Sequence, residues 1–168
     1  MVILCGHEAE AREALEEVQT WTASVGRQLH PVKRRRVDAA QGGGLDFLGY
    51  HWERGYRWPR KKSREKFQAS IGAQTGRTNG QSLKAIILSV NRTLKGWFAY
   101  FQHRHYTTFS RLEGWVGMRL RSILRRRRGG EGRGRGQDHQ LWPNAFFAER
   151  GLFSLVTAPT LARQSSGR

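Results

Sequence analysis

The stretch from Thr93 to Arg128 reads TLKGWFAYFQHRHYTTFSRLEGWVGMRLRSILRRRR. It spans most of two helix-length segments, joined by a short polar break, in which apolar residues recur at three- and four-residue steps. That recurrence is typical of one buried face on an α-helix. The first face begins just upstream of the stretch and comprises Ile87, Val90, Leu94, Trp97 and Phe101, with Phe98 widening it; the second comprises Phe109, Leu112, Val116, Leu120 and Ile123. The pattern predicts a pair of packed helices.

The second helix also carries a stripe of arginines. Arg121, Arg125 and Arg128 follow one another at i, i+4 and i+7, and Arg119 and Arg126 lie beside them. Residues at this spacing share one side of a helix. The pattern therefore predicts a buried side and a cationic side on the same helix, and the arginine run favours phosphate binding over a merely solvated face.

The composition narrows the class of partner. The 168 residues carry a formal net charge of +17, with a pI near 11.5, and 38% of them are hydrophobic. A positive charge of this size is usually neutralised by nucleic acid. No apolar run approaches the length needed to span a bilayer, and the start of the chain does not read as a signal peptide. With Cys5 as the one cysteine, a cysteine metal cluster is excluded, and a cytoplasmic protein without membrane attachment is expected.

The first part of the chain predicts strands and one acidic helix. Met1 to Leu4 reads as a strand, and a helix is expected from about Glu8 to Ser24, with Gly26 able to end it. Residues 1–20 have a net charge of −4, so this helix is not the nucleic-acid face. The basic run KRRRV at 33–37 and the alternating run LDFLGYHW at 45–52 are expected to be the two strands of a hairpin.

The segments between and after the central helices are read from composition. Residues 54–66 have no periodic apolar face and are expected to be an exposed segment along phosphates, with Tyr56 and Trp58 able to stack on bases. Residues 74–81 read as a polar linker, and residues 125–136, rich in arginine and glycine, as disordered until bound. A last helix is expected to start near Pro143 and stop at Gly151, before a frayed tail.

Several motifs, in order along the chain, carry a family resemblance. They are FLGY at 47–50, LKGWFAYF at 94–101, RLEGWVGMRLR at 111–121, WPNAFF at 142–147 and GLFSL at 151–155. This succession resembles the C-terminal part of group II intron reverse transcriptase/maturases. The GWxxYF core of the family's thumb-like maturase domain is matched by Gly96, Trp97, Tyr100 and Phe101, and its second helix by Trp115, Arg119 and Arg121.

The resemblance implies an α+β fold in two parts. A small helix-plus-β-hairpin remnant of the polymerase palm with a basic extension is expected over residues 1–66. A mainly α-helical thumb and maturase domain is expected over residues 67–160, followed by a disordered tail over residues 161–168.

The resemblance also bears on catalysis. Family members place a Tyr-Ala-Asp-Asp box, which binds two magnesium ions, just before an apolar strand like Met1 to Leu4, and no such box precedes that strand in this sequence. Asp38 and Asp46 are isolated, so the sequence predicts no catalytic residue, no polymerase activity for this chain alone, and no cofactor, with Mg²⁺ expected only in a full-length enzyme. It reads as a truncated form of the family.

Smaller features have a structural and a functional interpretation. Lys33 resembles a lysine near the incoming nucleotide in the family, but without the aspartates it has nothing to catalyse. Leu48 and Gly49 resemble the primer-grip turn, with an ordinary hairpin turn as the alternative. His103 and His105 do not suggest a metal site, because their side chains diverge on a helix and Arg104 repels a cation.

The function indicated is binding of structured intron RNA, assisting its folding and splicing as part of a reverse transcriptase. The alternatives are a remnant without function, a thumb subunit of a split polymerase whose partner is the missing N-terminal part, and a general basic RNA-binding protein. Trp97 and Phe101 are assigned to the core. The predicted RNA-binding residues are Arg57, Arg60, Lys61, Lys62, Lys95, Tyr100, Arg104, Tyr106, Arg119, Arg121, Arg125, Arg126 and Arg128.

Overall fold

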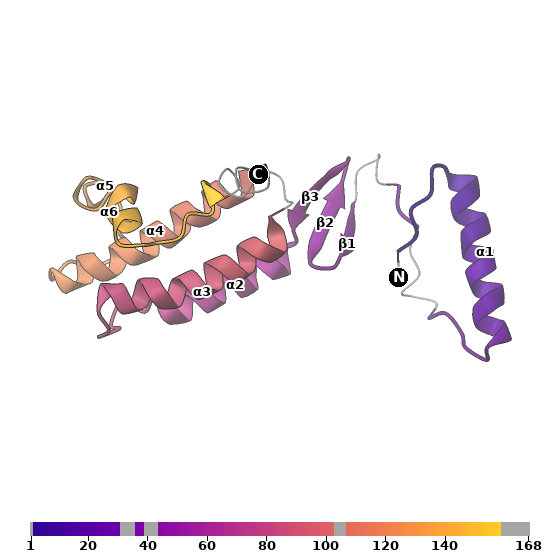
Figure 1. The fold of residues 1–168 in the computed structure, drawn as a ribbon, viewed down its shortest axis with the longest axis horizontal. Helices are drawn as coiled ribbons and strands as arrows, with labels where there is room; N and C mark the ends of the chain where they lie inside the picture. The colour runs from indigo at the N-terminus through magenta and orange to yellow at the C-terminus, as the bar shows by residue number, and fades with distance from the viewer. Residues whose placement is uncertain (1, 31–35, 39–43, 103–106, 159–168) are drawn as a thin grey trace, which may run out of the picture.

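A computed structural model describes residues 2–30, 36–38, 44–102 and 107–158 (Figure 1). One helix is followed by a small antiparallel sheet and then by five more helices, which confirms the predicted α+β class. The elements are α1 (Glu8–Ser24), β1 (Leu45–Phe47), β2 (Tyr50–Glu53), β3 (Tyr56–Pro59), α2 (Lys61–Gln74), α3 (Leu83–Phe101), α4 (Thr107–Arg127), α5 (Asp138–Leu141) and α6 (Asn144–Glu149).

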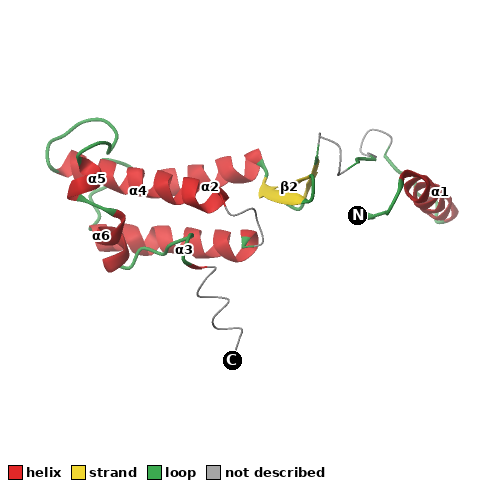
Figure 2. Ribbon diagram, turned by 90° about the horizontal axis from the view of Figure 1, so that it is seen from above, coloured by secondary structure: helices red, strands yellow, loops and turns green. Residues whose placement is uncertain are grey.

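Helix α1 has the bounds that its sequence predicts. Its N-cap is His7, whose ring Nδ1 accepts a hydrogen bond from the backbone N–H of Glu10, and Gly26 follows its end at a φ of +70°. No residue of α1 is buried, and Trp21 is 65% exposed. Both views of the ribbon show α1 apart from the sheet and the other helices (Figures 1 and 2).

The sheet has the order β1-β2-β3, with two tight turns. Phe47 pairs with Tyr50 and Glu53 pairs with Tyr56, so each turn has two central residues. Leu48 and Gly49 occupy the first turn, and all central residues of both turns have positive φ, as two-residue hairpin turns require. The prediction that residues 45–52 form a single strand is therefore wrong, because this stretch turns back on itself at Leu48 and Gly49.

Two other strand predictions are corrected or left open. Residues 2–5 lie in no strand, and Val2, Ile3 and Leu4 are exposed, with no described strand beside them to supply hydrogen bonds. Of the predicted strand at 33–37, residues 33–35 lie outside the described residues, and Arg36 and Val37 lie in no strand. The partner of β1 is β2 instead.

Most of residues 54–66 are exposed, as the sequence predicted, but they form regular secondary structure that it did not indicate. They supply β3 and the first turns of α2. These elements form without apolar periodicity in the segment itself. Backbone pairing with β2 holds β3, and two residues further on, Phe67 and Ile71, anchor α2. The domain boundary predicted between residues 66 and 67 falls inside α2.

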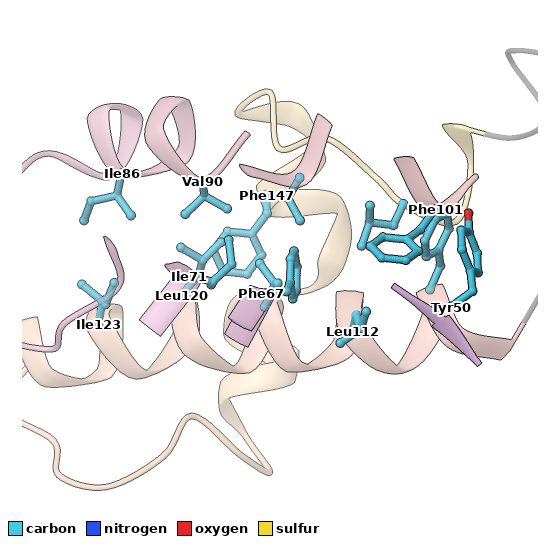
Figure 3. Close-up of a cluster of buried hydrophobic side chains, with 14 residues drawn as sticks. Tyr50, Phe67, Ile71, Ile86, Val90, Phe101, Leu112, Leu120, Ile123 and Phe147 are labelled. Atoms are coloured by element: carbon cyan, nitrogen blue, oxygen red, sulfur yellow. The ribbon is translucent and has the colours of Figure 1, made fainter. Parts of the chain in front are cut away.

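The predicted helix pair forms the core of the helical part, as α3 and α4 (Figure 3). The side chain of Ser82 caps α3 by accepting a hydrogen bond from the N–H of Ala85. All five apolar residues expected on α4 are buried, as is Phe101, whereas Trp97 is half-buried against this core. Phe67 and Ile71 of α2 and Phe147 of α6 complete the same cluster.

Aromatic contacts attach the sheet to α3. The Tyr50 ring packs edge-on against Phe101 with centroids 4.9 Å apart, and its hydroxyl donates to the carbonyl of Tyr100 over 2.7 Å. The Tyr100 hydroxyl in turn donates to the carbonyl of Leu48, also over 2.7 Å. The hairpin and the end of α3 are therefore joined by two reciprocal hydrogen bonds.

The segment after α4 is ordered, which corrects the expectation of disorder for residues 125–136. The backbone N–H of Gly134 donates to the Ser122 hydroxyl over 2.9 Å, so the loop lies directly on α4. A Cβ at Gly134 would come within 2.4 Å of the Arg121 Cβ, an approach that glycine permits. Helix α6 starts after Pro143 and is followed by Gly151 at a φ of +82°, as predicted. The tail at 159–168 lies outside the described residues.

Candidate nucleic-acid interface

A groove of about 840 Å³ lies between the sheet, the start of α2 and the first half of α4. One wall is formed by side chains that recur at four-residue steps on one face of α4, namely Thr107, Arg111 and Trp115. The opposite wall comes from the N-terminal turns of α2 and from β3.

The groove combines positive charge with aromatic rings. Arg60, Lys61, Arg64 and Arg111 supply the cations, and Trp58 and Trp115 supply the rings; together they line the groove. The Nε of Arg60 is buried and has no hydrogen-bond partner in the part of the chain that the structure describes. Cations that track a phosphate backbone, next to rings on which bases stack, are the usual components of a single-strand binding groove.

One rim of the groove is acidic. His51 Nδ1 lies 2.7 Å from Asp46 Oδ1, and its Nε2 lies 3.7 Å from Glu53 Oε2. Carboxylates repel phosphates but accept hydrogen bonds from the amino groups of bases. The rim therefore suits the base side of a strand, with its phosphates on the side of α2 and α4.

Of the basic residues predicted on the sheet and α2, Arg60 and Lys61 line this groove, whereas Arg57 and Lys62 are not among its lining residues. Arg57 in β3 packs over the Trp52 ring at 5.2 Å. Lys61 lies 3.9 Å from Glu65 in an exposed pair, which leaves its charge available, and Lys62 is exposed.

On α3, Lys95 is exposed. Tyr100 is 54% exposed, but one face of its ring stacks on Tyr50 and its hydroxyl donates to Leu48. Gly49 of the primer-grip-like turn faces inward, because a Cβ there would lie 3.3 Å from Ser63 Oγ, whereas Leu48 is exposed. The role of this turn as a primer grip stays a prediction.

Arg119 joins α4 to the end of α2. Its Nε donates to the Thr75 hydroxyl over 3.0 Å, and its Nη2 donates to the carbonyls of Gly72 and Thr75 over 3.0 and 2.9 Å. Burial lowers the pKa of Arg119, and the charges of Arg77 and Arg133 lower it further. Arg119 therefore has a structural role, and its surroundings are cationic.

Arg121 is 1% exposed, which corrects the predicted cationic stripe. Its Nε donates to the carbonyl of Trp142 over 2.8 Å, its Nη2 donates to Asn144 Oδ1 over 2.6 Å, and its guanidinium lies over the Phe147 ring. The spacing indicated a shared helix face correctly, but the part of that face around Arg121 is covered by the segment from α5 to α6. Arg121 holds this segment to α4.

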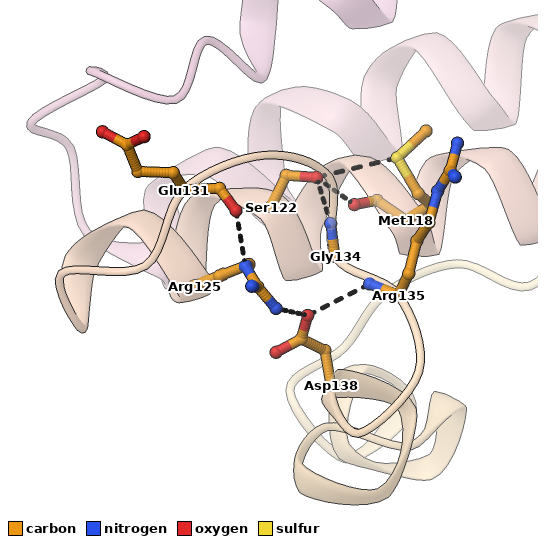
Figure 4. A network of polar contacts seen from close by, with 7 residues as sticks. All are labelled: Met118, Ser122, Arg125, Glu131, Gly134, Arg135 and Asp138. Carbon is orange, nitrogen blue, oxygen red and sulfur yellow. Dashed lines mark hydrogen bonds and ion pairs between the residues drawn. The ribbon is translucent and has the colours of Figure 1, made fainter.

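Arg125 belongs to a polar network between α4 and α5 (Figure 4). Its Nη1 lies 2.9 Å from Asp138 Oδ2, and its Nε donates to the carbonyl of Glu131. Asp138 also accepts the backbone N–H of Arg135 over 3.0 Å. Burial raises the pKa of Asp138, but these hydrogen bonds outweigh it and keep that pKa below its ordinary value. Arg125 is thus engaged within the protein.

Two arginines at the end of α4 face solvent. Arg126 is exposed and lies 3.5 Å from the exposed carboxylate of Glu131. Arg128 is exposed and lies over the Trp142 ring at 5.7 Å. Of the predicted arginine stripe, these two keep their charge accessible to a ligand.

Some predictions fall outside the described residues. These are the RNA contacts by Arg104 and Tyr106, and those for His103, His105 and Lys33. Over the described ranges, no group of three or more His, Cys, Asp or Glu side chains is placed to hold a metal ion. The helices found in those ranges are too short or too polar to cross a lipid bilayer.

The structure adds Arg64 and Arg111 to the basic residues of the groove. Arg111, Trp115 and Arg119 recur at four-residue steps, so the sequence contained a signal for a second polar stripe on α4. That stripe was hidden by the denser arginines further along the helix. Arg64 carried no pattern of its own, because residues 54–66 have no periodic apolar face.

Residues 64–142 match the family model described as the group II intron, maturase-specific domain. The matched range covers most of α2, all of α3 and α4, and the segment through α5. The match confirms, over residues 64–142, the resemblance found in the sequence. The matched domain is the maturase-specific part of such proteins, distinct from the catalytic polymerase part. No curated protein matches the chain.

Proposed function

We propose that this chain binds the structured RNA of a group II intron, and that the binding helps the intron fold for splicing. A function related to group II intron maturases follows from the domain over residues 64–142. The observation that carries the RNA-binding proposal is the groove, in which four cations and two tryptophans line one continuous hollow. Two of the basic residues that line the groove, Arg64 and Arg111, lie within that domain. Lys61 lies in the same helix as Arg64, just before the domain begins.

The arrangement favours an irregular or single-stranded part of the RNA. An A-form duplex is recognised mostly through its shape and its backbone, whereas unpaired bases can be stacked on aromatic side chains. Trp115 and Arg111 both line the groove, one helical turn apart on α4, so one nucleotide can have its base stacked and its phosphate neutralised together. In a complete reverse transcriptase, the same surface would also hold the template and primer.

A competition experiment tests the proposal. Labelled intron RNA from the same genome is bound to the purified chain and displaced by unlabelled intron RNA or by duplex RNA of equal length, at several salt concentrations. Steep salt dependence is expected with either competitor, because phosphate contacts release counterions. The intron is expected to compete about tenfold better, a difference of about 1.4 kcal/mol. Equal competition would identify a general basic RNA-binding protein instead.

Matched variants connect the binding to the groove. Arg64→Gln combined with Arg111→Gln removes two charges from its walls, whereas Arg27→Gln combined with Arg54→Gln removes two exposed charges elsewhere. We expect the first pair to abolish the preference for intron RNA and the second pair to preserve it. A preference that survives the first pair would place RNA recognition outside the groove.

A further inference from the structure

One face of the small sheet lies along the groove. Asp46, His51 and Trp58 oppose one another across the three strands, and Glu53 opposes Tyr56 beside them. Opposed residues, and residues two apart in a strand, point to the same side of a sheet. These five side chains therefore share one face, and all of them except Tyr56 line the groove.

The other face of the sheet is occupied by the helical core. Tyr50 is part of the core cluster, and Trp52 packs against it. Because successive side chains of β2 alternate between the two faces, this packing turns His51 and Glu53 away from the core and towards the groove. Both side chains are only partly buried, so a ligand in the groove can reach them.

Three rings form a row on the groove face of the sheet. The ring centroids of His51 and Trp58 lie 6.4 Å apart, and those of Trp58 and Tyr56 lie 6.0 Å apart. The side chain of Tyr56 is exposed. Bases stack on such rings whatever their identity, because every base has a π-face. The row can therefore hold an unpaired strand but does not choose among its bases.

The carboxylate of Glu53 can supply that choice. His51 is held to Asp46, with 2.7 Å between Nδ1 and Oδ1, whereas its Nε2 lies 3.7 Å from Glu53 Oε2, which is longer than a hydrogen bond. An ionised carboxylate accepts hydrogen bonds and donates none. Cytosine presents an amino donor at C4, where uracil, like thymine, presents an oxygen acceptor. Glu53 thus attracts the C4 substituent of cytosine and repels that of uracil.

We propose that this sheet face selects cytosine, and by the same chemistry other bases with an exocyclic amino group, over uracil in an unpaired segment of the bound RNA. Glu53 is the acceptor that makes the selection, and the row of rings holds the bases. The phosphates then follow Arg60 and Lys61, which line the same groove. This proposal rests on the proposed RNA function for its class of ligand.

Two oligonucleotides with the same backbone and the same ring size test the selection. Fluorescence anisotropy compares the affinity of the chain for oligocytidylate and for oligouridylate of about eight nucleotides, a usual length for a single-strand site. We expect oligocytidylate to bind about fivefold more tightly at neutral pH, which is the effect of about one hydrogen bond.

Two matched variants locate the selection. Glu53→Gln should abolish the difference between the oligonucleotides, because an amide can accept from cytosine and donate to uracil. The control is Glu65→Gln, which removes a carboxylate from the same groove on the side of α2. Both variants should bind both oligonucleotides more tightly, since each loses one negative charge that repels phosphates, but the control should retain the preference for oligocytidylate.

The proposal is overturned if the parent binds both oligonucleotides equally or binds neither, if the preference survives Glu53→Gln, or if it is lost in Glu65→Gln. These outcomes are independent of the competition between intron and duplex RNA. A preference for oligocytidylate in a chain that does not prefer intron RNA would leave the selection standing and refute the proposed function. A preference for intron RNA without a preference for oligocytidylate would do the reverse.

Discussion

Replacing Arg121 by alanine should separate folding from RNA binding. Its guanidinium is buried, donates one hydrogen bond to the carbonyl of Trp142 and one to Asn144, and lies over Phe147. The substitution removes both bonds, leaves the carbonyl of Trp142 without that donor and opens a space under α6. The sequence alone placed Arg121 among the RNA-binding residues, so the variant distinguishes two opposed interpretations.

The expected loss of stability follows from these contacts. A hydrogen bond from a charged donor contributes about 1.5–3 kcal/mol, and the substitution removes two of them. We therefore expect Arg121→Ala to lower the free energy of unfolding by about 3–5 kcal/mol. This is a large part of the total for a domain of ordinary stability, about 5–15 kcal/mol.

Urea unfolding followed by tryptophan fluorescence measures the loss, and filter binding at low urea measures RNA affinity. The matched variant is Arg111→Ala, on the same helix but exposed in the groove. We expect it to change stability by less than about 0.5 kcal/mol and to weaken RNA binding about fivefold, close to 1 kcal/mol. The reasoning is refuted if the free energy of unfolding of Arg121→Ala lies within about 1 kcal/mol of that of the parent, or if this variant weakens binding as much as Arg111→Ala does.

Three further predictions use the same unfolding assay. Gly134→Ala should destabilise by about 1–3 kcal/mol, because the new Cβ would lie 2.4 Å from that of Arg121, whereas Gly76→Ala, with nothing within 4 Å of its Cβ, should be close to neutral. Phe109→Ala should cost about 3–5 kcal/mol, since its ring is fully buried against two aromatic rings of α3, and a cost below 1 kcal/mol would contradict this packing. Asp138 has a pKa below its ordinary value of 3.8, so its contribution should be complete above about pH 4 and decline as the pH falls through the lowered pKa; Asp138→Asn should remove this part of the acid dependence, and an unchanged acid profile would refute it.

The helices with a clear apolar period were predictable from the sequence. In α4, Phe109, Leu120 and Ile123 are buried as their spacing requires, and α1 has the predicted bounds, with Gly26 after its end. A buried helix face is written in one local period, so no distant contact is needed to recognise it.

The two wrong predictions on the loop around Gly134 and on Arg121 share a physical cause, which is dependence on contacts elsewhere in the chain. The loop around Gly134 was expected to be disordered because its composition is polar, but Ser122 and Asp138 satisfy its backbone. The burial of Arg121 depends on Trp142 and Asn144, which lie more than twenty residues further along the chain. The sequence therefore located the basic segments correctly but could not tell which arginines the protein uses for its own structure.

The hydrogen bonds between Tyr50 and Tyr100 and between Tyr100 and Leu48 also couple movement of the hairpin to the C-terminal end of α3. A hairpin that is tied at its turn and at its second strand cannot tilt without pulling on the C-terminal end of α3. A ligand that displaces the hairpin must therefore also displace the C-terminal end of α3, which costs free energy. Binding free energies measured separately for the sheet and for the helices should consequently not be additive, because the two tyrosine hydroxyls couple these parts.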